Sequence, residues 1–188
     1  MKLIGRDREL AVVREHLRSG KNLVVFGPAG VGTTALVREA APEALYCADT
    51  STLKTACESL LAALRLPGAA ADNVARKRAI LKAVAGRRHW FVFDHFGRVS
   101  PKLESFLENI HAAHSMILVA RRLAWPDLGH LRMILWDFDR LEIKPLPRGA
   151  MREILRDRAG ELAADFERDL LRLAHGNPGR LIELCEQA

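Results

Sequence analysis

The sequence predicts an α/β protein in which a parallel β-sheet carries helices on both faces. Short, continuously apolar segments alternate along the chain with helical patterns, and such segments are typical of strands that are buried on both sides. A glycine-rich segment joins the first of these strands to a helix, and the pattern after Pro147 is helical only. A chain of 188 residues has the length of one domain with a small appendage.

We therefore expect an α/β core over residues 1–146 and a small helical lid over residues 147–188. The first helix illustrates the evidence, because Leu10, Val13 and Leu17 fall on one helical face. The expected strands cover residues 22–26, 44–48, 89–93, 116–120 and 141–144. The expected helices cover residues 6–19, 33–41, 52–64, 74–85, 102–111, 148–158, 161–174 and 178–187.

The composition narrows the class of protein. Apolar residues make up 49% of the chain and charged residues 28%, which excludes disorder as the default state. No apolar run reaches the ~18 residues that cross a bilayer, and the charged start of the chain does not resemble a signal peptide, so we expect a cytoplasmic protein without a membrane partner. Three scattered cysteines are too few for a disulfide framework or a zinc cluster. The net charge of +6 is compatible with partners that carry phosphate groups.

The segment between the first strand and the next helix carries the strongest motif. A phosphate loop requires a glycine, four further residues, a second glycine, a lysine, and then serine or threonine. Gly27 and Gly32 occupy the glycine positions and Thr34 the hydroxyl position, whereas Thr33 stands where the lysine is required. The order of strand, turn and helix indicates a nucleotide-binding loop whose candidate residues are Gly27, Pro28, Ala29, Gly30, Val31, Gly32, Thr33, Thr34 and Ala35.

The presence of Thr33 in place of lysine affects nucleotide binding and hydrolysis to different degrees. Backbone N–H groups and the helix N-terminus attract an anion without any particular side chain, and the Thr34 hydroxyl remains available to ligate Mg²⁺. A hydrogen bond to a charged group is worth about 1.5–3 kcal/mol, so the missing ammonium weakens nucleotide affinity roughly ten- to a hundredfold. Hydrolysis suffers more, because the same cation stabilises the charge of the transition state.

Two further strands end in residues that suit this chemistry. Asp94 follows the apolar segment 90–93 and is the expected Mg²⁺ ligand, together with Thr34. His95 stands where many related enzymes carry a second acid, and it is either a weak general base or a side chain without a chemical role. Arg121 follows the strand 116–120 and either reaches the γ phosphate or remains solvated. We therefore take Asp94, His95 and Arg121 as the candidate catalytic residues.

These motifs, in this order, resemble the AAA+ and STAND classes of P-loop ATPases, with an NB-ARC-like or archaeal-ATPase-like core. Residues 4–10 resemble the opening Gly-Arg-x-x-Glu-Leu motif of the family, and residues 27–34 resemble its Walker A loop. Residues 91–94 are similar to the Walker B strand, and residues 117–121 to the sensor 1 strand. Residues 141–146 and 175–181 resemble the strand that leads to the lid and the Gly-x-Pro motif of the lid.

The resemblance implies a P-loop sheet with strand order 5-1-4-3-2 and a helical lid, and it implies ATP or ADP with Mg²⁺ as cofactors. It places Gly5, Arg6 and Pro178 near the adenine, and it places Arg180 at the sensor 2 position with a spacing that Gly179 shifts. The Walker A and Walker B motifs are degenerate at Thr33 and His95. The chain is also shorter than many STAND proteins, which continue into further domains.

Three functions follow as alternatives. The first is a nucleotide-responsive regulatory domain that binds ATP or ADP weakly, hydrolyses poorly, and acts as a switch or assembly subunit through self-association or a protein partner. The second is an active ATPase that an arginine from a neighbouring subunit completes. The third is a scaffold that binds DNA or a protein without nucleotide. Arg148, Arg152 and Arg156 form one basic stripe at helical spacing and would contact the DNA.

Overall fold

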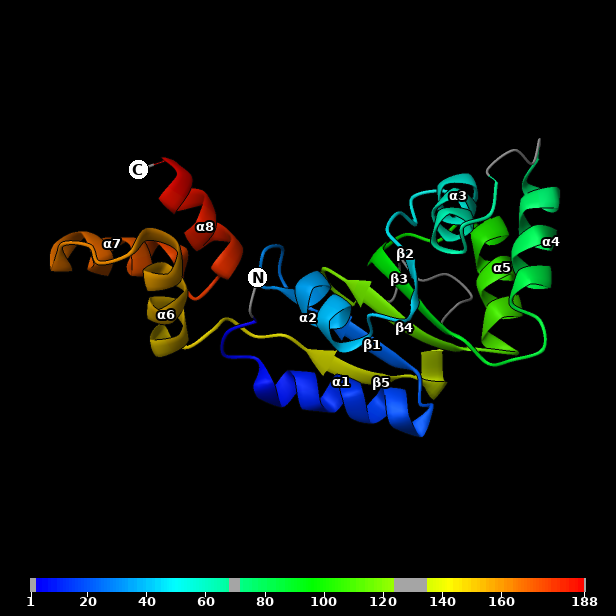
Figure 1. Cartoon of the computed structure of the whole chain (residues 1–188), viewed down its shortest axis with the longest axis horizontal. Coiled ribbons are helices and arrows are strands. Elements are labelled where there is room, and N and C mark those ends of the chain that lie inside the picture. Colours follow the sequence, from blue (N-terminus) through cyan, green and yellow to red (C-terminus); the bar gives the residue numbers. More distant parts are fainter. Residues whose placement is uncertain (1–2, 68–71, 124–134, 188) are drawn as a thin grey trace.

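The computed structural model describes residues 3–67, 72–123 and 135–187. It contains a five-stranded parallel sheet in the order β2-β3-β4-β1-β5, which is the predicted order 5-1-4-3-2 read from the other edge (Figure 1). All five carboxyl ends therefore lie at the same edge of the sheet. The strands are β1 (Leu23–Phe26), β2 (Leu45–Cys47), β3 (Trp90–Phe96), β4 (Ser115–Ala120) and β5 (Asp139–Glu142).

Helices cover both faces of the sheet, as the continuously apolar strands predict. Helices α1 (Asp7–Ser19) and α2 (Thr33–Ala40) share one buried apolar cluster with one face of the sheet. Helices α3 (Leu53–Ala63), α4 (Asn73–Ala83) and α5 (Pro101–His111) share a larger cluster with the other face. The fold class predicted from the sequence is confirmed.

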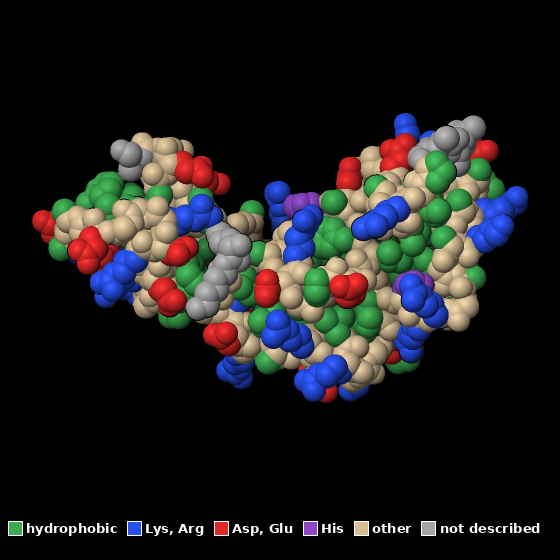
Figure 2. All heavy atoms as spheres, viewed as in Figure 1, with side chains coloured by type: hydrophobic (Ala, Val, Ile, Leu, Met, Phe, Trp, Pro, Cys, Tyr) green, Lys and Arg blue, Asp and Glu red, His purple; other side chains and the backbone are tan. Residues whose placement is uncertain are grey.

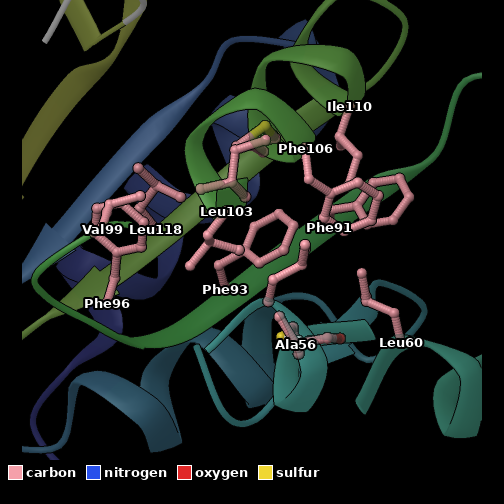
Figure 3. Close-up of a cluster of buried hydrophobic side chains, with 14 of the residues drawn as sticks. Ala56, Leu60, Phe91, Phe93, Phe96, Val99, Leu103, Phe106, Ile110 and Leu118 are labelled. Atoms are coloured by element: carbon pink, nitrogen blue, oxygen red, sulfur yellow. Dashed lines mark hydrogen bonds between the residues drawn. The ribbon is translucent and has the colours of Figure 1, made fainter. Parts of the chain in front are cut away.

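Strand β3 shows how the alternation of side chains builds the two clusters. Phe91 and Phe93 are fully buried and point to the face that α5 covers, with their rings stacked at 6.1 Å between centroids. Val92, between them, belongs to the cluster on the opposite face. Phe106 and Ile110 of α5 pack against the two phenylalanines (Figure 3). The buried centre of the sheet thereby fixes the position of Asp94, which follows in the same strand.

Local signals fix several helix ends. The side chains of Thr52, Asp72 and Ser100 accept hydrogen bonds from backbone N–H groups in the first turns of α3, α4 and α5. The sequence placed the start of α7 (Ala164–Ala174) three residues too early, at 161. It also placed β5 two residues too late and ended β3 at 93, whereas β3 continues to Phe96 through an irregularity in its pairing with β4. A short 3₁₀ helix over Leu135–Asp137 was not predicted.

The last three helices lie at one end of the molecule, apart from α3–α5 at the other end (Figure 1). Helices α6 (Arg148–Ala159), α7 and α8 (Pro178–Gln187) pack around an apolar cluster of their own. Figure 2 shows that the surface is notched between these helices and the sheet-containing part. Among the helices of the described ranges, none has both the length and the apolar character that a membrane span requires.

Candidate nucleotide-binding site

The loop between β1 and α2 presents unpaired backbone N–H groups at the carboxyl edge of the sheet. The first regular hydrogen bond of α2 runs from the Leu36 N–H group to the Gly32 carbonyl over 3.0 Å. The N–H groups of Thr33, Thr34 and Ala35 precede it in the first turn, where a helix has no acceptors of its own. Together with the positive end of the helix dipole, these groups form a cradle for an anion.

Glycines give the loop its shape. Gly30 and Gly32 have φ angles of +79° and +101°, which side chains rarely tolerate. A Cβ atom on Gly27 would lie 2.6 Å from the carbonyl oxygen of Ile143, so the chain beside β5 approaches the loop too closely for a side chain. The Gly27 N–H group donates to the carbonyl of Ala120 over 3.2 Å and ties the loop to the end of β4.

Thr33 and Thr34 are half-buried in the first turn of α2, where the motif predicts them. Neither hydroxyl group has a hydrogen-bond partner within residues 3–67, 72–123 and 135–187. Both hydroxyl groups are therefore available to a ligand. Thr33 contributes no charge to the loop, in contrast to the lysine of the complete motif.

Asp94 is buried near the end of β3, at the same edge of the sheet as the loop. Only 2% of the surface of Asp94 is exposed. One carboxylate oxygen, Oδ1, accepts a hydrogen bond from the N–H group of His95 over 2.7 Å. The other oxygen, Oδ2, accepts a hydrogen bond from the hydroxyl group of Tyr46 in β2.

Tyr46 was not identified from the sequence, because Leu45-Tyr46-Cys47 shows only the pattern of a short strand. Burial, and next the hydrogen bond to Asp94, raise the pKa of Tyr46 to about 12. The guanidinium carbon of Arg38 lies 4.3 Å from the centroid of the Tyr46 ring. Arg38 belongs to α2, so this contact connects the helix of the phosphate loop to the neighbour of Asp94.

His95 lies in the irregular part of β3 and is exposed. Its φ angle of +52° is unusual for a residue other than glycine. The hydroxyl group of buried Thr50 lies 3.1 and 3.2 Å from the carbonyl oxygens of Asp94 and His95, and supports this turn of the backbone. The imidazole is thus open to solvent beside the buried carboxylate.

Arg121 directly follows β4, which lies between β1 and β3 in the sheet. Its position is therefore between the end of the strand that leads to the loop and the end of the strand that carries Asp94. Arg121 is exposed, and within the part of the chain that the structure describes it has no hydrogen-bond or ion-pair partner. This cation is available to an anion at the carboxyl edge.

A small apolar pocket of about 60 Å³ adjoins the loop. Gly32 and Ala35 form its wall on the side of the loop and α2, and Pro178 forms its wall on the side of α8. Val31 of the loop also lines it, and the remaining apolar lining comes from the N-terminal segment, the chain after β5, α6 and α8, with Leu3, Ile4, Leu146, Ile154 and Ile182. Asp157 and Arg158 of α6 are its charged residues besides Arg6.

Arg6 borders this pocket but is occupied by protein groups. Its side chain is only 4% exposed. Nη2 donates to the carbonyls of Val31 and Lys144 over 3.0 and 2.7 Å, and Nη1 pairs with Glu9 over 2.8 Å. Arg6 therefore joins the phosphate loop to the chain that leaves β5. Gly5 packs against α6 instead, where an added Cβ atom would lie 2.7 Å from that of Ala150.

The N-terminus of α8 rests directly on the phosphate loop. The Gly179 N–H group donates to the carbonyl of Gly30 over 2.9 Å, and Nδ2 of Asn177 donates to the carbonyl of Ala29 over 2.7 Å. Pro178 faces the apolar pocket, whereas Arg180 lines a separate hollow beside Ala29 and Gly30. Asn177 was missed as a site residue, although an asparagine directly before a helix that starts with proline is a recognisable capping signal.

The cysteines take no part in this arrangement. Burial raises the pKa of Cys47 to about 12 and that of Cys57 to about 11. Both thiols are therefore protonated near neutral pH and belong to the apolar core.

A family model described as AAA ATPase domain matches residues 2–176, which include the loop, Asp94 and most of the residues around the pocket. The chain belongs to this family. The membership agrees with the resemblance to AAA+ ATPases that the motifs indicate. No curated protein matches the chain significantly.

Solved structures share the fold of this AAA ATPase domain. A STAND protein with a tetratricopeptide repeat sensor from Pyrococcus horikoshii aligns with a TM-score of 0.60 and 20% identity over 99% of the chain and 30% of its own. Aeropyrum pernix ORC1 in complex with DNA aligns with a TM-score of 0.72 and 18% identity over 99% of the chain and 61% of its own. Cdc6p from Pyrobaculum aerophilum aligns with a TM-score of 0.63 and 13% identity over 96% of the chain and 59% of its own. The chain thus spans less than two thirds of each of these proteins.

Proposed function

We propose that this AAA ATPase domain binds ATP or ADP weakly, hydrolyses ATP slowly or not at all, and acts as a nucleotide-responsive switch or assembly subunit. The observation that carries the proposal is that Gly32 and Ala35 belong both to the phosphate loop with the first turn of α2 and to the lining of the apolar pocket. The N–H group of Ala35 belongs to the anion cradle, and the residue also lines the apolar pocket. A nucleotide with its phosphates on the cradle would direct its base toward this pocket.

The metal site would be completed by the nucleotide. Mg²⁺ is usually held by one or two protein oxygens together with phosphate oxygens and water. The hydroxyl group of Thr34 at the start of α2 and the carboxylate of Asp94 near the carboxyl end of β3 supply such oxygens at the same edge of the sheet. When bound, the metal would neutralise phosphate charge, and Asp94 would orient it.

Slow hydrolysis follows from the two altered positions. Thr33 offers a hydroxyl group where a complete loop offers an ammonium group, so less charge opposes the negative transition state. His95 offers an exposed imidazole in place of a carboxylate next to Asp94. Arg121 is one cation available near the cradle, and it would supply charge stabilisation without restoring a base.

The switch role rests on the contact between α8 and the loop. The proposed pocket has one wall from Ala35 of α2 and another from Ile154 of α6 and Pro178 of α8. A bound base would therefore contact both parts and stabilise their present arrangement. Loss of nucleotide would leave the hydrogen bonds of Asn177 and Gly179 as the direct connections between α8 and the loop.

Calorimetric titration with ATP and ADP tests the proposal. Ala35→Phe fills the pocket from α2 and should weaken binding at least tenfold, whereas Ala83→Phe, at an exposed position of α4, should leave it unchanged. Circular dichroism checks that both variants fold. Equal affinities of the wild type and Ala35→Phe, or no binding of either nucleotide to the wild type, would overturn the proposal.

DNA binding without nucleotide is a second candidate, which one cationic hollow favours. Arg148 of α6 and Arg168 and Arg172 of α7 line a hollow of about 380 Å³, where Arg168 is paired with Asp165 and Arg172 with Asp169. Arg152, which the predicted stripe includes, is paired with Glu167 over 2.6 Å. Gel-shift assays at low salt test this candidate, because it requires retention of DNA that ATP does not affect and that neutralisation of Arg148, Arg168 and Arg172 abolishes. Failure to retain DNA at low salt would exclude it.

A further inference from the structure

The carboxylate that would serve the metal already has a hydrogen-bond donor at each oxygen. The His95 N–H group donates to Oδ1 of Asp94, and the Tyr46 hydroxyl group donates to Oδ2. Asp94 itself is only 2% exposed. Burial of a carboxylate without hydrogen-bond donors is strongly unfavourable, so these two hydrogen bonds compensate for the burial of Asp94. The backbone donor is fixed by the chain, whereas the donor from Tyr46 depends on one side chain.

We propose that Tyr46 is a positioning residue of the metal site, whose hydroxyl group holds Asp94 in the absence of Mg²⁺ and competes with Mg²⁺ for this carboxylate. The inference rests on the proposed function, because the metal arrives with the nucleotide. In our proposal Tyr46 does not touch the nucleotide. It therefore acts through Asp94.

The chemistry of the Tyr46 hydroxyl fits this role. A phenol keeps its proton at physiological pH, so the Tyr46 hydroxyl group donates its hydrogen bond to Oδ2 of Asp94. A carboxylate oxygen that accepts this hydrogen bond donates less electron density to a cation or to its bound water. A hydrogen bond to a charged group corresponds to a factor of roughly ten or more in an equilibrium constant. Metal binding must overcome this factor or share the oxygen.

The position of Tyr46 also connects the two halves of the metal site. Its ring lies against Arg38, which is four residues after Thr34 and hence on the same side of α2. Thr34 and Asp94, the two residues that would serve Mg²⁺, are thus linked through the contacts of Arg38 with Tyr46 and of Tyr46 with Asp94. A change in the position of α2 at the loop reaches Asp94 by this route.

The first test is the Mg²⁺ dependence of ADP affinity, measured by calorimetry on the full chain. Tyr46→Phe removes the hydroxyl group and keeps the ring against Arg38, so we expect the half-saturating Mg²⁺ concentration to fall about tenfold. Ser59→Ala is the matched control, because it removes a hydroxyl group that accepts from the N–H group next to β2 and does not contact Asp94. We expect the control to match the wild type within about twofold, the usual size of a small structural effect.

The second test uses the wild type and depends on no variant. Tyr46 is the one tyrosine of the sequence, so ¹³C labelling of tyrosine Cζ gives a single resonance that reports the hydrogen bond of its hydroxyl group. We expect Mg²⁺ with ADP to shift this resonance and ADP alone to leave it in place.

The outcomes separate the two proposals. If ADP binds but Tyr46→Phe leaves the half-saturating Mg²⁺ concentration unchanged or raises it, the role of Tyr46 is wrong and the proposed nucleotide site stands. A Cζ resonance that Mg²⁺ with ADP does not shift has the same meaning. If no ADP binds to any of the proteins, the proposed function itself fails and the inference falls with it.

Discussion

The contact between α8 and the phosphate loop makes a prediction about two glycines. Gly179 packs its backbone against Gly30, and a Cβ atom on Gly179 would lie 2.8 Å from the Gly30 Cα atom and 3.0 Å from its carbonyl oxygen. Gly149 of α6 is the matched control, because an added Cβ atom there meets nothing within 4 Å. Replacing either glycine by alanine makes the same chemical change in a helix.

The two substitutions should change the free energy of unfolding in opposite directions. Helix propensity alone favours alanine over glycine by about 0.5–1 kcal/mol, so Gly149→Ala should raise the free energy of unfolding by that amount. Gly179→Ala gains the same propensity but forces two backbones apart, and overpacking of this kind costs about 1–3 kcal/mol. It also strains the hydrogen bond from the Gly179 N–H group to Gly30. We therefore expect a net loss of about 1 kcal/mol or more for Gly179→Ala.

Urea unfolding followed by circular dichroism measures both effects, and the slope of the transition checks that both variants unfold as the wild type does. ADP titration of the same samples adds a functional readout, since displacement of α8 opens the proposed pocket at Pro178. Gly179→Ala should bind ADP more weakly and Gly149→Ala should bind it normally. Stabilisation of equal size by the two substitutions would refute the close contact between α8 and the loop.

Three other predictions follow from single side chains. Arg6→Ala should lower the free energy of unfolding by about 3 kcal/mol, because it leaves the buried carbonyl of Val31 and the partly buried carbonyl of Lys144 without their charged donor. A loss under about 1 kcal/mol in urea unfolding would contradict this. Asn177→Ala should lower the free energy of unfolding by about 2 kcal/mol, since it removes the hydrogen bond to Ala29 and the cap of the Arg180 N–H group. Asn177→Ser should recover roughly half of this loss by restoring the cap. Equal losses in both variants would be inconsistent with a capping role. Burial, and next the positive charges nearby, lower the pKa of His114 below 6.5, so stability should be complete above pH 6.5 and fall as the pH drops below it. His114→Gln should flatten this decline in unfolding measured across pH, and an unchanged slope would show that another group causes it.

The sequence was sufficient to predict those parts of the fold that repeated patterns determine. Strands such as Phe91–Phe93 are apolar on both faces, so their parallel pairing and helical cover follow from burial alone. The edge strand β5 is different. Its backbone pairs Asp139 with Leu23 and Glu142 with Phe26, although most of its side chains are exposed. The apolar pattern of Leu141 and Ile143 therefore gave a strand shifted by two residues, because hydrogen bonds to β1 rather than burial determine where β5 begins.

In the candidate site, too, local motifs were predictable, whereas contacts between distant segments were not. The glycines of the loop and the acid at the end of β3 occupy positions that a local motif defines, so they were predictable. Tyr46 and Thr50 reach Asp94 and His95 only through the pairing of β2 with β3, which no local pattern contains. The occupation of Arg6 by two backbone carbonyls likewise depends on the close approach of the loop to the chain after β5.

The central claim is that a nucleotide site persists although its phosphate loop lacks the lysine. Equilibrium titration of ATP and ADP, with and without Mg²⁺, on the wild type and on Thr33→Lys tests this claim most directly. We predict that the wild type binds both nucleotides and that Thr33→Lys binds them roughly ten- to a hundredfold more tightly, because it restores a charged donor at the loop. A wild type that binds neither nucleotide, or a Thr33→Lys variant with unchanged affinity, would contradict the claim.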